Sequence, residues 1–560
     1  MRVAVVGSGV AGMAASRVLL DAGHRVDVID VGHVPEPSSE ELAARIRAQV
    51  ESGARVERSL LRELKWGPGE APVRGLRDAL GAILGGSVAG ERVAKRILGS
   101  RFVFEGVEEG IPLTGATVPR SLARGGLSNV WGAACYPLRE IDYAGWPLNQ
   151  EDLAPWYERA AEMMSLLQPQ DDLARSYPLH GSIAENVPRN SGSVAELLLA
   201  HWERQSDALA EFGWAAGRAR LAVRPSGSAD DACRECGLCF YGCPFGSIYV
   251  SGRTIDELSS HERFAYRTGL LVHTFAEHEN GVEVRARRVD SGVEERRSYD
   301  ALFLAAGTLS SLRIAADSLA LHDRPVPLLD NDMYLLPVLA RGAGGRGRFR
   351  ARFSLSEAAL AVPPGTLADG GIHIQFYSFH EYFLAELGEL LGMMPELVQR
   401  VAWNMLNRML IGFVYFAGQD SAVATARVRR AAGPGCVEVE VRQSAASRTA
   451  LRGLLRRMRS ARQTLGFRPL SPLIKAAPLG FSGHLSGSLA MRRQPGPLET
   501  DPEGRLHGTE RVCVVDAASF PALPPQNPTF TLVAAAMRAA DAFCRRVDPR
   551  MPPSATAVRG

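Results

Sequence analysis

The sequence has none of the long apolar runs that a membrane-spanning helix requires. No stretch of about 18 consecutive apolar residues occurs in the chain, so no transmembrane helix is expected. The first predicted strand begins at residue 2, so we expect no signal peptide before it. We therefore expect a cytoplasmic protein whose eight cysteines serve as reduced thiols or metal ligands rather than as disulfides.

An excess of charge is missing as well. The formal net charge is only +3, which gives no electrostatic reason to expect nucleic acid as a partner. Lysine is almost absent, and we interpret the arginine-rich basic set as coding bias rather than as a phosphate-binding surface. The length of 560 residues allows two or three domains with substantial cores.

What the chain does contain begins with a glycine-rich turn. Residues 3–6 are apolar, as in a buried parallel strand that begins at Arg2, and a G-x-G-x-x-G turn and a helical pattern follow at once. A second apolar run ends in an aspartate whose carboxylate can accept hydrogen bonds from a ribose. The pattern predicts a dinucleotide site at a helix N-terminus, against the alternative of a turn that binds nothing. Its candidate contacts are Gly7, Gly9, Val10, Ala11, Gly12 and Asp30.

Residues 33–100 interrupt the alternation of strands and helices that a nucleotide-binding domain would show. Charged sequence with helical spacing fills this segment. We interpret it as an insertion over the nucleotide domain, and we favour an inert surface hairpin over a lid.

Two further stretches have side chains small enough for their backbone to lie against a flat cofactor. The first is a tight loop with an aromatic residue, with candidate contacts Gly125, Gly126, Ser128, Asn129, Trp131 and Gly132. The second is the end of a buried strand over residues 301–304, with candidate contacts Ala305, Ala306 and Gly307. Between them, residues 269–273 and 282–286 are expected to be paired strands of the nucleotide domain, and Val272 is a further candidate contact.

Four cysteines follow the spacing C-x2-C-x2-C-x3-C-P of bacterial ferredoxins. They are Cys233, Cys236, Cys239 and Cys243. Thiolates at this spacing can converge on one iron–sulfur cluster, although in two-cluster ferredoxins the last cysteine serves the other cluster. No second run occurs here, so a structural zinc site and a metal-free turn remain open as alternatives.

Residues 322–475 show a different sequence pattern, in which strand-like runs alternate with helical segments. We expect a separate substrate domain with a mainly antiparallel sheet, using strands at 334–338, 372–379, 410–416 and 437–441. Within it, the segment from Glu396 carries an apolar helical stripe from Leu397 to Met409. The stripe could line an apolar tunnel or touch a membrane, but the interpretation as core is favoured.

The end of the chain offers two polar side chains in glycine- or proline-marked segments. His484 lies between Gly483 and Gly487, and Asn527 precedes Pro528 at the start of an alanine-rich helix. Together they indicate one site, although a single histidine is more often structural.

Taken together, these motifs resemble the glucose–methanol–choline (GMC) oxidoreductases, flavoproteins that oxidise alcohols. The resemblance rests on the glycine turn with Asp30, the loop from Gly125 to Trp131, residues 305–308, and the segment from His484 to Thr529. It implies an α/β fold with a discontinuous Rossmann-like FAD-binding domain and a second α+β substrate domain on a mainly antiparallel sheet. The expected FAD-binding segments are 1–165, 223–320 and 479–560, and the expected substrate segments are 166–222 and 321–478.

The resemblance also implies roles for single residues. Asp516 and Ala517 would lie near the ribityl and pyrophosphate groups, and Asn527, Pro528 and Thr529 at the flavin ring. His484 would accept the hydroxyl proton of the alcohol, and Asn527 would hold the developing alkoxide while FAD takes the hydride. Val130 stands where one branch of the family attaches flavin covalently through histidine, so the FAD is expected to be non-covalent.

The cysteine run is found in bacterial dehydrogenase branches of this family. We therefore expect a dehydrogenase that passes electrons to a protein or quinone rather than to oxygen, with an iron–sulfur cluster as a candidate second cofactor. The alternatives are a flavin-dependent reductase or decarboxylase on the same scaffold, and a non-catalytic electron-transfer protein. The sequence leaves open which alcohol is the substrate, and the oligomeric state.

Overall fold

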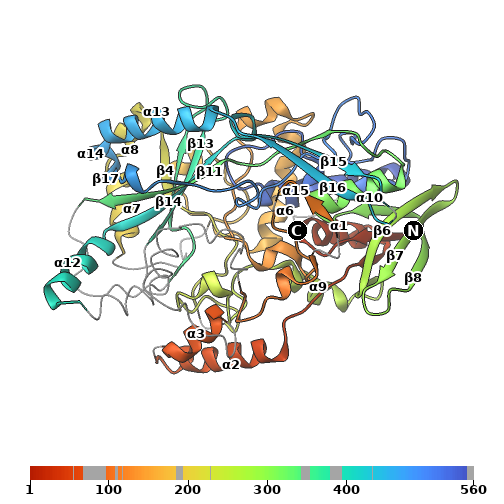
Figure 1. Cartoon of the computed structure of the whole chain (residues 1–560), viewed down its shortest axis with the longest axis horizontal. Helices are drawn as coiled ribbons and strands as arrows, with labels where there is room; N and C mark the ends of the chain where they lie inside the picture. Colours follow the sequence, from red (N-terminus) through yellow and green to blue (C-terminus); the bar gives the residue numbers. More distant parts are fainter. Residues whose placement is uncertain are drawn as a thin grey trace.

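The computed structural model describes residues 1–54, 56–66, 96–107, 111–116, 118–183, 193–227, 229–341, 353–378, 394–431 and 433–550. The chain forms a part built on a parallel sheet and a part built on a larger antiparallel sheet. Figure 1 shows the larger antiparallel sheet toward one end of the long axis, and the helices and strands that cover the parallel sheet toward the other. In the described residues no helix is both long and apolar enough to cross a membrane.

The first part contains a five-stranded parallel sheet. Its strands lie in the order β19-β9-β1-β2-β5, and every neighbouring pair is parallel. Residues 3–6 are all buried, as expected of a strand that has layers on both faces. This confirms the predicted Rossmann-like domain and shows that the chain returns to it twice. The strands are β1 (Arg2–Val6), β2 (Arg25–Ile29), β5 (Phe264–Arg267), β9 (Ala301–Leu304) and β19 (Val512–Val514).

Layers cover both faces of the parallel sheet. One face packs against a core supplied by α1 (Val10–Asp21), α6 (Gln150–Met164), α9 (Ser251–Ser259) and α15 (Thr529–Val547). The other face packs against α10 (Thr308–Ser318) and an antiparallel sheet of β6 (Leu270–His278), β7 (Gly281–Arg288) and β8 (Glu294–Tyr299). The predicted pairing of residues 269–273 with 282–286 is therefore confirmed.

A four-stranded sheet joins the same core. Its order is β10-β15-β16-β3, and the apolar side chains of β15 and β16 pack with those of β1 and β9. The strand expected at 437–441 is thus present, but it lies against the nucleotide domain rather than in the antiparallel sheet of the substrate domain. The strands are β3 (Leu113–Thr114), β10 (Val326–Leu328), β15 (Val423–Arg429) and β16 (Cys436–Arg442).

The second part is an antiparallel sheet in the order β17-β11-β14-β13-β12-β4, with β18 paired to β11. It confirms the predicted antiparallel sheet. The strands are β4 (Ala215–Arg218), β11 (Met333–Ala340), β12 (Ala358–Val362), β13 (Ile372–Ser378), β14 (Met409–Phe416), β17 (Phe467–Pro469) and β18 (Lys475–Ala476).

Side chains alternate between the two faces of this sheet, as strand geometry requires. On β13, Ile372, Ile374 and Phe376 belong to the outer core, which is completed by the helices α7 (Val194–Arg204), α8 (Ser206–Glu211), α13 (Ala446–Ser460) and α14 (Arg462–Leu465). The intervening side chains point toward the nucleotide domain, and we call this side the inner face. Its members on the three central strands are His373, Gln375 and Tyr377 on β13, Met409, Ile411, Phe413 and Tyr415 on β14, and Met333, Leu335, Pro337 and Leu339 on β11.

Two helices of the insertion pack on the cysteine run. They are α2 (Pro37–Glu51) and α3 (Arg58–Trp66), drawn at the bottom of Figure 1. Leu42, Ile46 and Leu60 form a small core with Leu238, and Arg47 donates a 2.9 Å hydrogen bond to the carbonyl of Pro244. The rest of the insertion, residues 67–95, lies outside the described residues.

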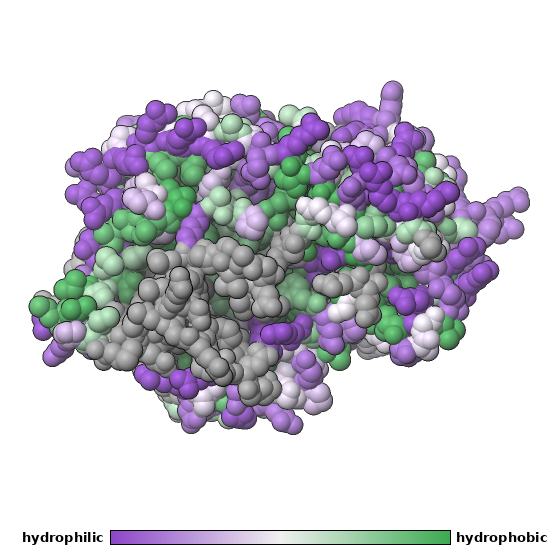
Figure 2. Space-filling view, viewed as in Figure 1, coloured by the Kyte–Doolittle hydropathy of each residue, from purple (hydrophilic) through white to green (hydrophobic). Residues whose placement is uncertain are grey.

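The apolar stripe from residue 397 is core only at its end. Leu406 and Met409 are buried in a small cluster, whereas the interpretation as core is wrong for the preceding part of the stripe. Helix α12 (Glu396–Leu406) forms as predicted, but Leu397 and Val401 are 68% and 63% exposed. Met409 is not part of the helix but begins β14. Figure 2 shows this apolar patch at the end of the molecule where α12 lies. Helical spacing specifies one apolar face, but it does not specify what covers that face.

Short 3₁₀ segments complete the described structure. They are η1 (Phe102–Phe104), η2 (Gly126–Asn129), η3 (Glu140–Gly145), η4 (Asp172–Arg175), η5 (Cys239–Tyr241), η6 (Gly418–Asp420), η7 (Ser471–Leu473) and η8 (Ala517–Ser519).

Candidate active site

The three glycines of the N-terminal turn have different surroundings. Gly7 has a φ of +101°, and a Cβ there would lie 2.4 Å from the carbonyl oxygen of Ala305. A Cβ on Gly12 would lie 2.1 Å from the carbonyl oxygen of Gly7, so both positions require glycine. Gly9 has an ordinary φ of −63°, and a Cβ there would meet no described atom within 4 Å. Open space therefore adjoins Gly9, which caps α1, and Val10 and Ala11 begin that helix with amides suited to an anion.

Asp30 ends β2 next to this turn. Its Oδ2 accepts hydrogen bonds from the amide and the hydroxyl of Ser8 and, at 3.3 Å, from the hydroxyl of Tyr266. Burial raises the pKa of Asp30 to about 6, and these donors partly oppose the shift. Asp30 thus lies against the glycine turn, and its contact with a ribose stays a prediction.

The glycine and aromatic loop lies directly against the N-terminal turn. Gly125 has a φ of +84° and donates its amide to Ser8 Oγ at 2.9 Å. Asn129 closes the loop from within, because its Nδ2 donates to the carbonyls of Arg124 and Gly126 at 3.0 and 2.7 Å. Trp131 is held by a 2.8 Å bond from Nε1 to the carbonyl of Tyr249. The structure therefore brings together two stretches that are separated by more than a hundred residues.

Ser251, at the start of α9, links these two loops and was not found from the sequence. Its hydroxyl donates to the carbonyls of Ser8 and Gly125 at 2.9 and 3.0 Å, and it lies 3.1 Å from the hydroxyl of Ser128. Tyr266 on β5 was not found from the sequence either. Both depend on long-range packing, and no local pattern in the sequence marks them.

Asp516 fixes the end of β9 from the C-terminal segment. Its Oδ2 accepts the amide of Gly307 at 2.8 Å and the hydroxyl of Ser311 at 2.5 Å, and its Oδ1 accepts the amide of Ala518. Ala517 begins the following 3₁₀ turn, and Pro528 and Thr529 begin α15. Val272 is buried on β6, and its carbonyl accepts from Arg313 at 3.0 Å.

His484 and Asn527 meet although they are 43 residues apart, with Asn527 Nδ2 lying 3.2 Å from His484 Nε2. The other imidazole nitrogen, Nδ1, lies 2.7 Å from Asn331 Oδ1. Asn331 Nδ2 donates to the carbonyls of Phe416 and Pro524 at 2.6 and 3.0 Å, so Oδ1 can only accept. Nδ1 therefore carries the proton, and Nε2 is the bare nitrogen that faces Asn527.

The inner face of the seven-stranded sheet continues this network. Gln375 Nε2 donates to Asn527 Oδ1 and lies 3.2 Å from His373 Nε2, and Gln375 Oε1 accepts from the hydroxyl of Tyr377 at 3.0 Å. These contacts leave Asn527 Nδ2 to face His484. The alternation of polar residues at 373, 375 and 377 was a signal in the sequence that pointed to them.

Burial keeps the titratable groups of this site neutral. Desolvation lowers the pKa of His484 to about 3, and it lowers the pKa of the fully buried His373 to about 3 as well. Desolvation also raises the pKa values of Tyr377 and Tyr415 above the ordinary value of a phenol. The Tyr415 ring lies 5.4 Å from the His484 ring. The imidazole of His484 is therefore unprotonated at neutral pH.

The four cysteines of the run lie near one another but are not arranged as a metal site. The amides of Glu235 and Ser247 point to the sulfurs of Cys233 and Cys243 at 3.4 and 3.3 Å. Burial, together with the neighbouring thiols, raises the pKa of Cys233 to about 12. Among the described residues, no group of three or more His, Cys, Asp or Glu side chains is placed to hold a metal ion.

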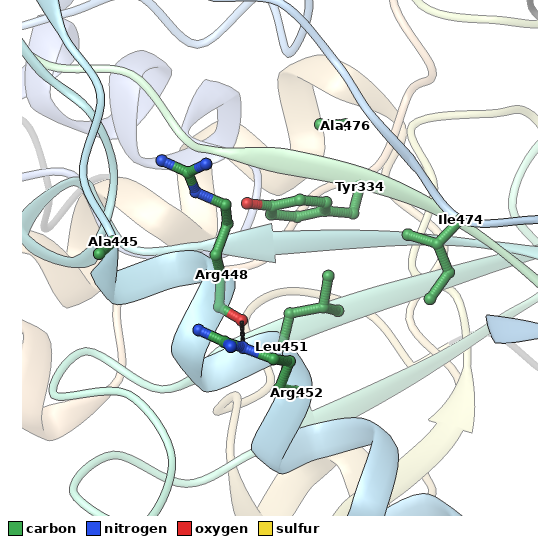
Figure 3. A pocket seen from close by; sticks show the side chains of 7 residues that line it. All are labelled: Tyr334, Ala445, Arg448, Leu451, Arg452, Ile474 and Ala476. Atoms are coloured by element: carbon green, nitrogen blue, oxygen red, sulfur yellow. Dashed lines mark hydrogen bonds between the residues drawn. The ribbon is translucent and has the colours of Figure 1, made fainter. Parts of the chain in front are cut away.

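A surface hollow of about 510 Å³ lies elsewhere, on the outer side of the seven-stranded sheet. Figure 3 shows its lining, with Tyr334 and Ile474 facing Arg448 and Leu451 of α13. Tyr334 alternates with the inner-face residues of β11, so the sheet separates the hollow from His484. We do not assign the chemistry to it.

Comparison with known proteins agrees with this arrangement. The GMC oxidoreductase family model matches residues 419–536, a segment that includes both His484 and Asn527. A solved structure of pyridoxine 4-oxidase from Mesorbium loti is 15% identical, with a TM-score of 0.57, over 98% of this chain and 100% of that one. A structure of a fungal aryl-alcohol oxidase is 13% identical, with a TM-score of 0.52, over 97% and 99%. No curated protein matches the sequence significantly.

At these identities the two structures establish a shared fold over almost the whole chain. The family match adds the C-terminal segment that carries the His–Asn pair. The chain therefore carries a GMC oxidoreductase C-terminal domain over residues 419–536, and it shares its fold with both oxidases over almost its whole length.

Proposed function

We propose that the protein is an FAD-dependent enzyme that oxidises an alcohol to a carbonyl compound. The observation that carries the proposal is the pairing of His484 Nε2 with Asn527 Nδ2 at 3.2 Å, with the imidazole tautomer set by Asn331. A bare imidazole nitrogen beside an amide donor suits the removal of a hydroxyl proton.

The residues around the N-terminal turn fit FAD. The open space at Gly9 adjoins the start of α1, where a pyrophosphate would meet unpaired backbone amides. Gly126 approaches the same point, since a Cβ on it would lie 3.6 Å from Gly9 Cα. Asp30 would bind the adenosine ribose, and the contacts from Gly125 to Gly132, at Val272, at 305–307, at 516–517 and at 527–529 remain part of this proposal. When bound, FAD supplies the acceptor for the hydride that leaves the alcohol carbon.

His484 would act as the general base. Its Nδ1 donates a hydrogen bond to Asn331 Oδ1, and its Nε2 carries no proton. The imidazole would therefore present the Nε2 lone pair toward the substrate hydroxyl. The lowered pKa means that this lone pair is available throughout the working range.

Asn527 would hold the substrate oxygen. Its Oδ1 is occupied by Gln375, so its Nδ2 is the group left to donate toward His484 and toward an oxygen bound between them. A neutral donor in a buried site can stabilise a developing alkoxide without titrating.

We further propose a dehydrogenase, with electrons leaving to a protein or quinone rather than to oxygen, in a cytoplasmic protein. The support is the cysteine run, which resembles that of dehydrogenase branches. The described cysteines are not arranged to hold a metal ion, so we assign no step to a cluster. Oxygen uptake compared with dye reduction, at equal alcohol concentration, separates a dehydrogenase from an oxidase.

The test of the proposal is an absorption spectrum followed by anaerobic titration. We expect flavin bands in the purified protein, release of the flavin into the supernatant on acid denaturation, and bleaching of the bands by an alcohol. Flavin that pellets with the protein would contradict the non-covalent assignment based on Val130. Flavin that no alcohol bleaches would contradict alcohol oxidation.

A further inference from the structure

We propose that the alcohol is uncharged and largely apolar, and that it lies along the inner face of the seven-stranded sheet over Phe413, Ile411 and Tyr377. This inference rests on the proposed function and names the substrate class of that same site.

The first support is the composition of the inner face. Antiparallel register places side chains of the three central strands in rows across the sheet. One row holds Leu335, Phe413 and Gln375, and the next holds Pro337, Ile411 and Tyr377. Within the described bounds of β4, β11, β12, β13 and β14, no Asp, Glu, Lys or Arg occupies an inner-face position. On these five strands the ionisable groups of the inner face are His373 and the two buried tyrosines, Tyr377 and Tyr415, and burial holds all three neutral. The short strands beside β11 add two cations to the margin of this face, because Lys475 on β18 pairs with Leu335 and Arg468 on β17 pairs with Leu339.

The second support is the connection between this face and the reacting pair. Gln375 bonds directly to Asn527, and Phe413 is its neighbour across the strands. The Phe413 ring lies 4.7 Å from the Tyr377 ring, which in turn lies 6.0 Å from Phe240. The Tyr377 hydroxyl donates to Gln375, so the polar atom of this aromatic side chain is already bonded.

The third support is exposure. Side chains of the outer face, such as Leu336, Ile374 and Val414, are fully buried, whereas Leu335, Ile411 and Phe413 on the inner face are only partly buried. Apolar side chains that a fold leaves partly open beside a catalytic pair are suited to an apolar ligand.

The charges that lie next to Gln526, the chain neighbour of Asn527, are already compensated. Gln526 donates to Asp142 at 2.8 Å, and Asp142 is paired with Arg139 through bonds of 2.6 and 3.0 Å. Both side chains are 7% exposed, so neither offers a free charge to a substrate. Over Phe413, Ile411 and Tyr377 themselves, a charged group would lose its hydration without gaining a partner, because Lys475 lies beyond Leu335 at the margin of the face.

The test uses the holoenzyme and two matched pairs of alcohols in anaerobic flavin reduction. Within each pair only a remote carboxylate differs: 1-hexanol against 6-hydroxyhexanoate, and benzyl alcohol against 4-(hydroxymethyl)benzoate. We expect the carboxylate to lower the ratio of reduction rate to dissociation constant by about a hundredfold or more. Across 1-butanol to 1-hexanol, we expect a rise of about threefold to fourfold per methylene.

A variant that adds a positive charge to the inner face tests whether the effect of the carboxylate arises there. Ile411→Lys should raise the rate with 6-hydroxyhexanoate at least about tenfold and lower the rate with 1-hexanol. The matched control is Val423→Lys, which adds the same charge at a position 62% exposed on a different sheet and should change neither rate.

The two proposals fail in different ways. Flavin that none of these alcohols reduces would overturn the proposed function. Flavin that 6-hydroxyhexanoate reduces within tenfold of 1-hexanol, in the unaltered enzyme, would leave alcohol oxidation standing and overturn the apolar substrate class.

Discussion

His484 Nδ1 lies 2.7 Å from Asn331 Oδ1, and this contact decides which imidazole nitrogen can take a proton. Asn331 comes from the segment between β10 and β11, and two backbone carbonyls fix its amide. The acceptor is neutral, so the fold supplies no negative charge to stabilise an imidazolium. Together with desolvation, this accounts for a pKa of His484 near 3.

The first prediction is that the acid side of the pH–rate profile lies at unusually low pH. Because the folded pKa of His484 is lowered, the imidazole stays neutral as the pH falls through the ordinary value of about 6.5, and activity that needs the base is kept there. The ratio of reduction rate to dissociation constant should therefore be flat between about pH 5 and 8. Asn331→Asp places a carboxylate on Nδ1 and should move the acid limb up by about one pH unit or more. A limb near pH 6.5 in the unaltered enzyme that Asn331→Asp leaves in place would contradict this role.

The second prediction concerns Gln375 as a positioning residue. Gln375→Glu keeps the shape but removes the hydrogen that Asn527 Oδ1 accepts, so the Asn527 amide should turn its Nδ2 away from His484. We expect the reduction rate to fall about 10- to 100-fold with the flavin content unchanged. The matched control is Gln463→Glu at an exposed position of α14, which should leave the rate unaltered. Equal rates in the two variants would remove Gln375 from the site.

The residues that the sequence identified are those that act through local conformation. The turn from Gly7 to Gly12 needs positive φ and close backbone approach, and both demands are visible in glycine spacing. The pairing of His484 with Asn527 was predicted by resemblance rather than by local physics, and the structure brings the two side chains together.

The site residues that the sequence did not reveal are brought to the His484–Asn527 pair by the register between strands. Asn331 and Gln375 reach the pair only because β11, β14 and β13 align in one sheet, and that pairing is not encoded in any short segment. The alternation of polar residues on β13 was the available signal. The error at α12 has a similar origin, because an apolar stripe on Leu397 and Val401 does not reveal whether anything packs on it.

The third prediction separates two glycines of the same turn. Gly9→Ala meets no described atom and has an ordinary φ, so we expect the apoprotein to keep its melting temperature while FAD affinity falls. Gly12→Ala meets the carbonyl of Gly7 at 2.1 Å and should destabilise the apoprotein by about 1–3 kcal/mol. Gly433→Ala, in open surroundings, is the control for both measurements. FAD binding by the Gly9→Ala variant at unaltered affinity would contradict the placement of the pyrophosphate.

The fourth prediction concerns the cysteine run. If Cys233, Cys236, Cys239 and Cys243 hold an iron–sulfur cluster, anaerobically purified protein should contain about three to four iron atoms and as many sulfides per chain. Zinc at about one per chain without sulfide would indicate a structural site. Neither metal is the result that the described arrangement of the thiols favours.

The division of labour between His484 and Asn527 is the central claim, and anaerobic stopped-flow flavin reduction across a pH series tests it most directly. His484→Ala removes the base and should slow reduction by about 10² to 10⁴, with a loss that shrinks as pH rises because hydroxide partly replaces the imidazole. Asn527→Ala removes one donor and should slow reduction by about 10 to 10³, with a loss that stays constant across the pH series. A His484→Ala variant that retains FAD and reduces it at the unaltered rate would contradict the account.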